Sequence, residues 1–189
     1  MRVYVPLISL VCVLFPAASS GPRAMSAAPT IGGVPKNCPD TTHFVSLFNV
    51  FDDGKAYGGL VGSAPAWLRG FSGPAATLTF GGVYQPGYGW GRKVLFVLKR
   101  GFKGTVTMSG GSVRGHAPLW FDAVEVGALD RPVRRLTLQA TRQLAFAGGA
   151  GPRQWPTFPG GITVPRAGCY YVEATWPGGK WRLTFAAGG

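Results

Sequence analysis

The stretch from Trp155 to Phe185 constrains the fold of this chain most strongly, because it contains two alternating runs separated by a Pro-Gly-Gly turn. In the first run, Cys169 to Trp176, every second residue is apolar or aromatic, and the second run, Lys180 to Ala186, has the same period. A period of two places alternate side chains on opposite faces of a strand. Pro177 and Gly178 suit the central positions of a type II turn. The stretch therefore predicts an antiparallel hairpin with one buried face.

The rest of the chain repeats this rhythm in short runs separated by glycine and proline, which together number 46 of 189 residues. Disorder is a poor explanation of that composition, because 24 aromatic residues are distributed through the same segments. Further strands are predicted at Phe44–Phe51, Thr77–Phe80, Val94–Leu98, Thr105–Ser109, Leu119–Val126 and Arg135–Thr141. About seven to nine strands at this spacing predict an all-β fold, an antiparallel two-sheet β-sandwich, with a barrel as the alternative.

The first 20 residues have the three parts of a secretory signal. Arg2 supplies the positive start, Val3 to Phe15 the apolar core, and small residues precede a cut before Gly21. The apolar run is shorter than the roughly 20 residues that span a bilayer, although an uncleaved anchor is the alternative. We expect a signal peptide over residues 1–20, a flexible lead over 21–36 and one sandwich domain over 37–189, secreted or held at the extracellular face of the cell envelope.

Cleavage would leave two cysteines, Cys38 and Cys169. An even pair in an oxidising compartment predicts a disulfide, with two free thiols as the alternative. The mature chain would carry 18 basic and 7 acidic residues, a formal net charge of +11. Outside a cell such a protein attracts polyanions, including acidic wall polymers, lipid headgroups and free nucleic acid. Charge that serves solubility alone is the alternative, and the sequence predicts no specific nucleic-acid partner.

The residues from Gly168 to Val172 are similar to the G-x-Y-x-[CV] motif of immunoglobulin-like sandwiches. That resemblance implies that Tyr170 forms a tyrosine corner, with its hydroxyl bonded to backbone just upstream. It also places Val172 where antibody domains carry a core cysteine. Cys169 alternates with Tyr170 and Val172, so it lies on the outward face of the predicted strand. Its bridge to Cys38 would attach the N-terminal segment across the sandwich instead of joining the sheets through the core.

From about Cys38 onward the chain also resembles uncharacterised exported bacterial proteins that end with a proline-bearing segment, an A-G-C-[WY] strand and a final L-T-F strand. The matching residues are Ile162, Val164, Pro165, Ala167 to Tyr170 and Leu183 to Phe185. This resemblance implies an immunoglobulin-like architecture and an exported location. It implies no activity, because a fold alone supplies none.

Catalytic and metal-binding chemistry have little support in the sequence. The two histidines, His43 and His116, are far apart, and a zinc or copper site would need further ligands. We therefore expect no metal, no cofactor and no catalytic residues. The alternative is a secreted enzyme whose site is built from loops around His43 or His116. A cleft that joins His43 to Asp40, Asp52 or Asp53 would favour that alternative.

Aromatic residues near glycine give the better indication of function. The segment from Gly81 to Gly91, G-G-V-Y-Q-P-G-Y-G-W-G, predicts a long loop, and we take Tyr84, Tyr88, Trp90 and Arg92 as a candidate binding surface. Exposed rings stack on sugars or bases, and arginine pairs with phosphate or carboxylate. Rings that cap the ends of the sandwich are the alternative. Other tryptophans in or beside predicted loops are Trp67, Trp120 and Trp155.

Taken together, these patterns predict a secreted or envelope-located binding or structural module that is not an enzyme. The candidate partners are an anionic cell-wall polymer, which would suit the charge, or an envelope protein.

Overall fold

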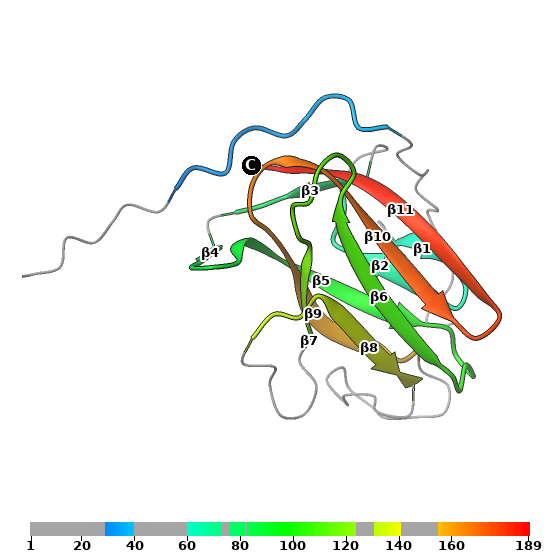
Figure 1. Cartoon of the computed structure of the whole chain (residues 1–189). Helices are drawn as coiled ribbons and strands as arrows, with labels where there is room; N and C mark the ends of the chain where they lie inside the picture. The colour runs from blue at the N-terminus through cyan, green and yellow to red at the C-terminus, as the bar shows by residue number, and fades with distance from the viewer. Residues whose placement is uncertain (1–28, 40–59, 73–75, 82, 124–130, 141–154) are drawn as a thin grey trace, which may run out of the picture.

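The computed structural model describes residues 29–39, 60–72, 76–81, 83–123, 131–140 and 155–189. These residues form eleven β-strands in two sheets that face each other (Figure 1). No helix in this part of the chain is long and apolar enough to cross a membrane. The predicted all-β sandwich is confirmed, although the expected strand count of seven to nine was too low. The strand predicted at Phe44–Phe51 lies outside the described residues.

The two sheets draw strands from all parts of the described chain. The first sheet contains β1 (Leu60–Ser63), β2 (Ala66–Arg69), β4 (Val83–Gln85), β5 (Gly89–Leu98), β7 (Trp120–Ala123) and β9 (Thr157–Val164). Its order is β1-β2-β5-β9-β7, and β4 pairs with the beginning of β5. The second sheet contains β3 (Thr77–Thr79), β6 (Thr105–Ser112), β8 (Arg135–Gln139), β10 (Gly168–Trp176) and β11 (Gly179–Gly188), in the order β3-β11-β10-β6-β8. All pairs are antiparallel except β3 with β11.

Seven of these strands have the pairing order of the immunoglobulin sandwich. In that fold, strands A, B, E and D form one sheet in this order, and C, F and G form the other. Here β2-β5-β9-β7 and β6-β10-β11 have the same order, and their succession along the chain is also that of A to G. The remaining strands, β1, β3, β4 and β8, are short additions at the edges. The fold is therefore an immunoglobulin-like sandwich with extra edge strands.

Four strands were not predicted from the sequence: β1, β2, β4 and β9. The longest of them, β9, contains Pro159, Gly160 and Gly161, which interrupt the apolar pattern. A Cβ at Gly161 would come within 2.6 Å of an Asp122 carboxylate oxygen, so a larger residue there would displace that side chain. The glycine that hides the strand from pattern analysis thus makes room for a side chain of the neighbouring strand.

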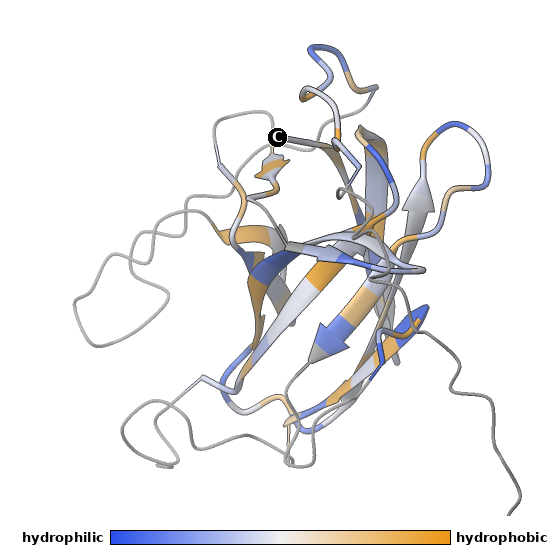
Figure 2. Ribbon diagram, turned by 90° about the vertical axis from the view of Figure 1, so that its left-hand side faces the viewer, coloured by the Kyte–Doolittle hydropathy of each residue, from blue (hydrophilic) through white to orange (hydrophobic). Residues whose placement is uncertain are grey.

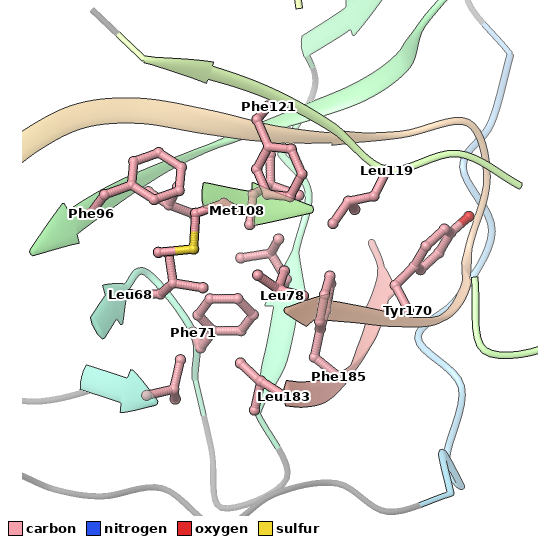
Figure 3. Packing of buried hydrophobic residues seen from close by; sticks show 14 of the residues in the cluster. Leu68, Phe71, Leu78, Phe96, Met108, Leu119, Phe121, Tyr170, Leu183 and Phe185 are labelled. Atoms are coloured by element: carbon pink, nitrogen blue, oxygen red, sulfur yellow. The ribbon is translucent and has the colours of Figure 1, made fainter. Parts of the chain in front are cut away.

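The core lies between the two sheets and is filled by alternate side chains of each strand, as Figure 3 shows for its central part. Phe96, Phe121 and Phe158 from the first sheet are fully buried, as are Met108 and Phe185 from the second. Figure 2 shows the same alternation as hydrophobic and hydrophilic segments that follow one another along single strands. The predicted inward set of β10 is buried except for its last member, which is half-buried.

A second, smaller cluster lies on the other face of the first sheet. Leu60, Trp67 and Val97 are buried there, with Leu95 and Trp155 packed against them. The Trp67 and Trp155 rings meet edge to face, with centroids 5.3 Å apart. β5 is therefore apolar on both faces, which explains the continuous apolar run that predicted it. These two tryptophans are packing residues.

The N-terminal strap, which we define as residues 29–39, lies against the domain (Figure 1). Ile31 belongs to the main core, and its carbonyl accepts a hydrogen bond of 3.0 Å from Ala167 N–H. The Gly32 carbonyl accepts one of 3.1 Å from Gly189 N–H. Ile31 and Gly32 both fall within the segment 21–36 for which the sequence predicted a flexible lead.

Substitution of Phe185 by alanine should destabilise the sandwich strongly. The ring is fully buried and meets the Phe71 ring edge to face, with centroids 5.2 Å apart. Replacement of a buried phenylalanine costs about 3–5 kcal/mol, so the free energy of unfolding in a denaturant titration should fall by about that amount. Thr175→Ala, at an exposed position of β10, is the control and should change it by at most about 1 kcal/mol. A small effect at Phe185 would contradict this packing.

Candidate binding surface

The segment from Gly81 to Gly91 is not the long loop that the sequence predicted. Its strand β4 pairs antiparallel with the beginning of β5, and Tyr88 N–H donates to the Gln85 carbonyl across the turn at 3.0 Å. Gly89 has φ +118°, and a Cβ there would overlap the Val164 carbonyl oxygen. The prediction was wrong because glycine at these positions removes the alternation that marks a strand. The hairpin fixes the positions of the candidate side chains.

Tyr84 and Trp90 form one aromatic pair. They are direct cross-strand partners on β4 and β5, and their ring centroids lie 5.4 Å apart with a tilt of 58°. Both rings are half-buried, and Trp90 packs against the main core. Arg92 lies two residues further along β5 on the same parity and is exposed. Trp90 therefore covers the end of the core while one side of the pair remains open to solvent.

Tyr88 forms a second pair with Trp120, the first residue of β7. Their centroids lie 5.1 Å apart, nearly perpendicular at 88°. The Arg134 guanidinium lies over the Trp120 ring, 4.4 Å from its centroid. Thr163, opposite Trp120 on β9, is almost completely buried. This pair lies on the outer face of the first sheet, since the next residue of β7, Phe121, points into the core.

The structure thus divides the predicted surface between two faces. Trp90 and Trp120 are paired with neighbouring residues of β9, Val164 and Thr163, whose side chains point to opposite faces of the sheet. We call the whole region the aromatic end, comprising Tyr84, Tyr88, Trp90, Trp120, Arg92 and Arg134. Its four rings are half-buried and its two arginines are exposed.

Two members of the aromatic end, Trp120 and Arg134, were not predicted from the sequence. Trp120 was noted beside a loop but not assigned to the surface. Arg134 had no sequence signal, because its place beside Trp120 depends on the pairing of its neighbour Val133 with β7. Phe121 and Val133 exchange two backbone hydrogen bonds of 2.8 and 2.7 Å, which hold the segment before β8 beside β7.

The cysteines and the predicted corner tyrosine lie where β10 begins. Cys38 and Cys169 form a disulfide with a Cα–Cα distance of 5.4 Å, so that prediction is confirmed and free thiols are excluded. The bridge attaches the N-terminal strap to β10 and does not pass through the core. The Tyr170 hydroxyl donates to the Arg166 carbonyl at 2.9 Å, the bond that the immunoglobulin resemblance implies. In Figure 3 this hydroxyl points away from the core.

The residues of the enzyme alternative are mostly outside the described part of the chain. His43, Asp40, Asp52 and Asp53 all lie there, and His116 is exposed in the connection between β6 and β7. Among the described residues, no group of three or more histidine, cysteine or acidic side chains could hold a metal ion.

Among the carboxyl groups in the described part of the chain, Asp122 has a shifted pKa. It lies on the same parity of β7 as Trp120, half-buried over Gly161, and burial raises the pKa of its carboxyl above the ordinary value of 3.8. Burial penalises the charged form, so ionised Asp122 destabilises the folded state.

Replacement of Asp122 by asparagine should therefore stabilise the protein at neutral pH. When the pKa of a carboxyl is higher in the folded than in the unfolded protein, the free energy of unfolding decreases as the pH rises from the unfolded pKa through the folded pKa. The difference in unfolding free energy between Asp122→Asn and wild type should be smallest below pH 3.8 and grow as the pH rises to neutral. Denaturant titrations across this range measure it. A variant that is less stable at neutral pH would show that the carboxylate makes a favourable contact.

Replacement of Tyr170 by phenylalanine should lower the free energy of unfolding by about 1 kcal/mol, because the Arg166 carbonyl loses its donor. Tyr171→Phe is the matched control, since it removes the neighbouring hydroxyl from the outer face of β10 and keeps the ring under the Arg182 guanidinium. Denaturant titration of both variants provides the test, and equal losses would contradict a structural role for the corner bond.

No protein-family model and no curated protein matches the chain. Among solved structures it is similar to the ASH/PapD-like domain of human CEP192 (PapD-like domain 7), with 13% sequence identity and a TM-score of 0.32. The likeness covers 67% of this chain and 86% of the other. At this level it adds nothing to the site, and the assignment of the fold depends on the pairing order of this chain's own strands.

Proposed function

We propose that this protein is an exported, non-catalytic binding module whose aromatic end binds an anionic polymer of the cell envelope. The observation that carries the proposal is the aromatic end itself. Two half-buried ring pairs are fixed on the β4–β5 hairpin and on β7, and two exposed arginines, Arg92 and Arg134, accompany them.

The chemistry of the aromatic end suits a charged polysaccharide. Tyrosine and tryptophan present flat apolar faces that stack on sugar rings, and their polar atoms remain available to solvent. Arginine forms bidentate hydrogen bonds to carboxylate and phosphate groups. The hairpin and the edge-to-face contact hold Tyr88 in place before a ligand arrives, which lowers the entropy lost on binding.

Two further observations support an extracellular anionic partner. The chain has a formal net charge of +12, which favours association with polyanions and raises the rate of encounter. The disulfide between Cys38 and Cys169 is of the kind that persists in oxidising compartments. The signal-like N-terminus and the resemblance to exported bacterial proteins point to the same location.

Substitution of Tyr88 by alanine should weaken binding to purified cell-wall material. Stacking on one aromatic side chain contributes about 1–3 kcal/mol in single-stranded nucleic-acid complexes, and a contribution of that size predicts roughly a 5- to 150-fold loss of affinity. Co-sedimentation of the protein with wall material over a salt titration measures the effect. Tyr88 is preferred to Trp90 for this test because Trp90 also packs against the core.

Tyr171→Ala is the matched control, because Tyr171 is also a half-buried tyrosine but lies on the outer face of the second sheet. It should leave wall binding unchanged. Binding that disappears at high salt and is insensitive to Tyr88→Ala would show non-specific charge attraction. Absence of binding to wall material would overturn the proposal.

A further inference from the structure

A groove of about 420 Å³ lies at the end of the sandwich where β6 ends and β10 begins. Three segments that are distant in sequence form it: the N-terminal strap, the chain that follows β6 and the turn before β10. In Figure 1 the strap passes over this end of the molecule, close to the C-terminus. The groove does not include any residue of the aromatic end.

The walls of the groove are fixed by covalent and hydrogen bonds. The strap is attached by the Cys38–Cys169 disulfide at one side and by the bond from Ala167 N–H to the Ile31 carbonyl at the other. On the opposite wall, Val113 N–H donates to the Cys169 carbonyl at 2.8 Å. Pro35 and Pro39, which line the groove on the strap, restrict its backbone further. The groove is therefore formed before any ligand binds.

The lining of the groove is basic. Arg114 and Arg166 contribute exposed side chains, and there is no carboxylate among the described residues that line it. Ser112 Oγ accepts a hydrogen bond of 3.1 Å from Ala117 N–H, which leaves its hydroxyl hydrogen available as a donor. Asn37 adds a side-chain amide. Two guanidinium groups and two neutral donors are a set that suits an anion with several oxygen atoms.

The charge of Arg166 is close enough to the corner tyrosine to affect it. Burial raises the pKa of Tyr170, and the positive charge of Arg166 and the bond to its carbonyl act in the opposite direction. Arg166 and Tyr170 both line the groove. A negative group bound there would have this cation beside it.

We propose that the groove binds a single phosphate or carboxylate group through Arg114 and Arg166, and that the Cys38–Cys169 bridge is required because it holds one wall in place. The site is separate from the aromatic end and would remain if the wall-binding proposal failed. Phosphate and carboxylate share the required chemistry, and separate probes distinguish them.

The test uses the oxidised protein and inorganic phosphate, with succinate as the carboxylate probe, at an ionic strength held constant with chloride. Two-dimensional amide NMR should show saturable shifts that cluster at the groove, including the amides of Asn37, Ala117 and Gly168. The probe with the lower dissociation constant identifies the preferred group. No saturable shift at the groove with either probe would overturn the proposal.

Arg114→Gln and Arg166→Gln should each weaken binding of the preferred probe by about tenfold, because each removes a charge-assisted hydrogen bond. Arg135→Gln, which removes the same charge from an exposed position on β8, is the control and should change the dissociation constant less than twofold. Equal losses in all three variants would overturn the site in favour of general charge attraction. These variants retain the disulfide and the core.

The role of the bridge is tested with Cys38→Ser/Cys169→Ser. Loss of the groove shifts, with the amide signals of β5 unchanged, would support a bridge-dependent wall. Unchanged affinity in this variant would overturn that part of the proposal. If the variant unfolds, the arginine variants still decide whether the groove binds an anion.

Discussion

Burial of alternate side chains between the two sheets is the interaction on which the rest of this structure depends. The hairpin of β10 and β11 contributes Tyr170, Val172, Leu183 and Phe185 to this layer, and β5 and β9 oppose them from the other sheet. Because the period of a strand is two, this burial fixes the register of every pair and therefore the side chains that reach the outer faces. The positions of Cys169, Tyr171 and Trp120 all follow from it.

The outer surfaces of the two sheets differ in character. The first sheet carries a second apolar cluster around Trp67 and, at its other end, the Tyr88–Trp120 pair. The second sheet presents a polar outer face on which Thr137, Thr107 and Thr175 are aligned across three strands. Aromatic surface available for binding is thus concentrated on the first sheet, while the groove lies at the junction of both sheets with the strap.

Sequence analysis succeeded where a strand buries one face and keeps an uninterrupted alternation. That pattern was sufficient for β6, β8, β10 and β11, and Gly178, at φ +97°, has the conformation that the predicted type II turn requires. It failed at β9, where glycine and proline replace the alternating residues, and at β4, which is only three residues long. Contacts with other strands favour glycine at such positions. Gly89, at the beginning of β5, lies against the Val164 carbonyl, and a local sequence pattern contains no record of that contact.

The candidate site was predictable only in part for a similar reason. Tyr84, Tyr88, Trp90 and Arg92 are near one another in sequence, so their proximity in space follows from chain connectivity. Their division between two faces depends on the register of β5 against β9, and the approach of Arg134 to Trp120 depends on the bridge between Phe121 and Val133. Information of this kind comes from tertiary pairing and is absent from any short segment.

The parallel pairing of β3 with β11 has a consequence for how the chain acquires its structure. β11 lies between β3 and β10, so the second sheet cannot be completed until residues near position 188 join residues near position 77. Such non-local pairing gives the fold a high contact order. Folding is slow in such proteins, because the chain loses the entropy of closing long loops before the stabilising contacts form. A ribosome delivers β3 more than 100 residues before β11, so β3 lacks its strand partner until β11 has emerged.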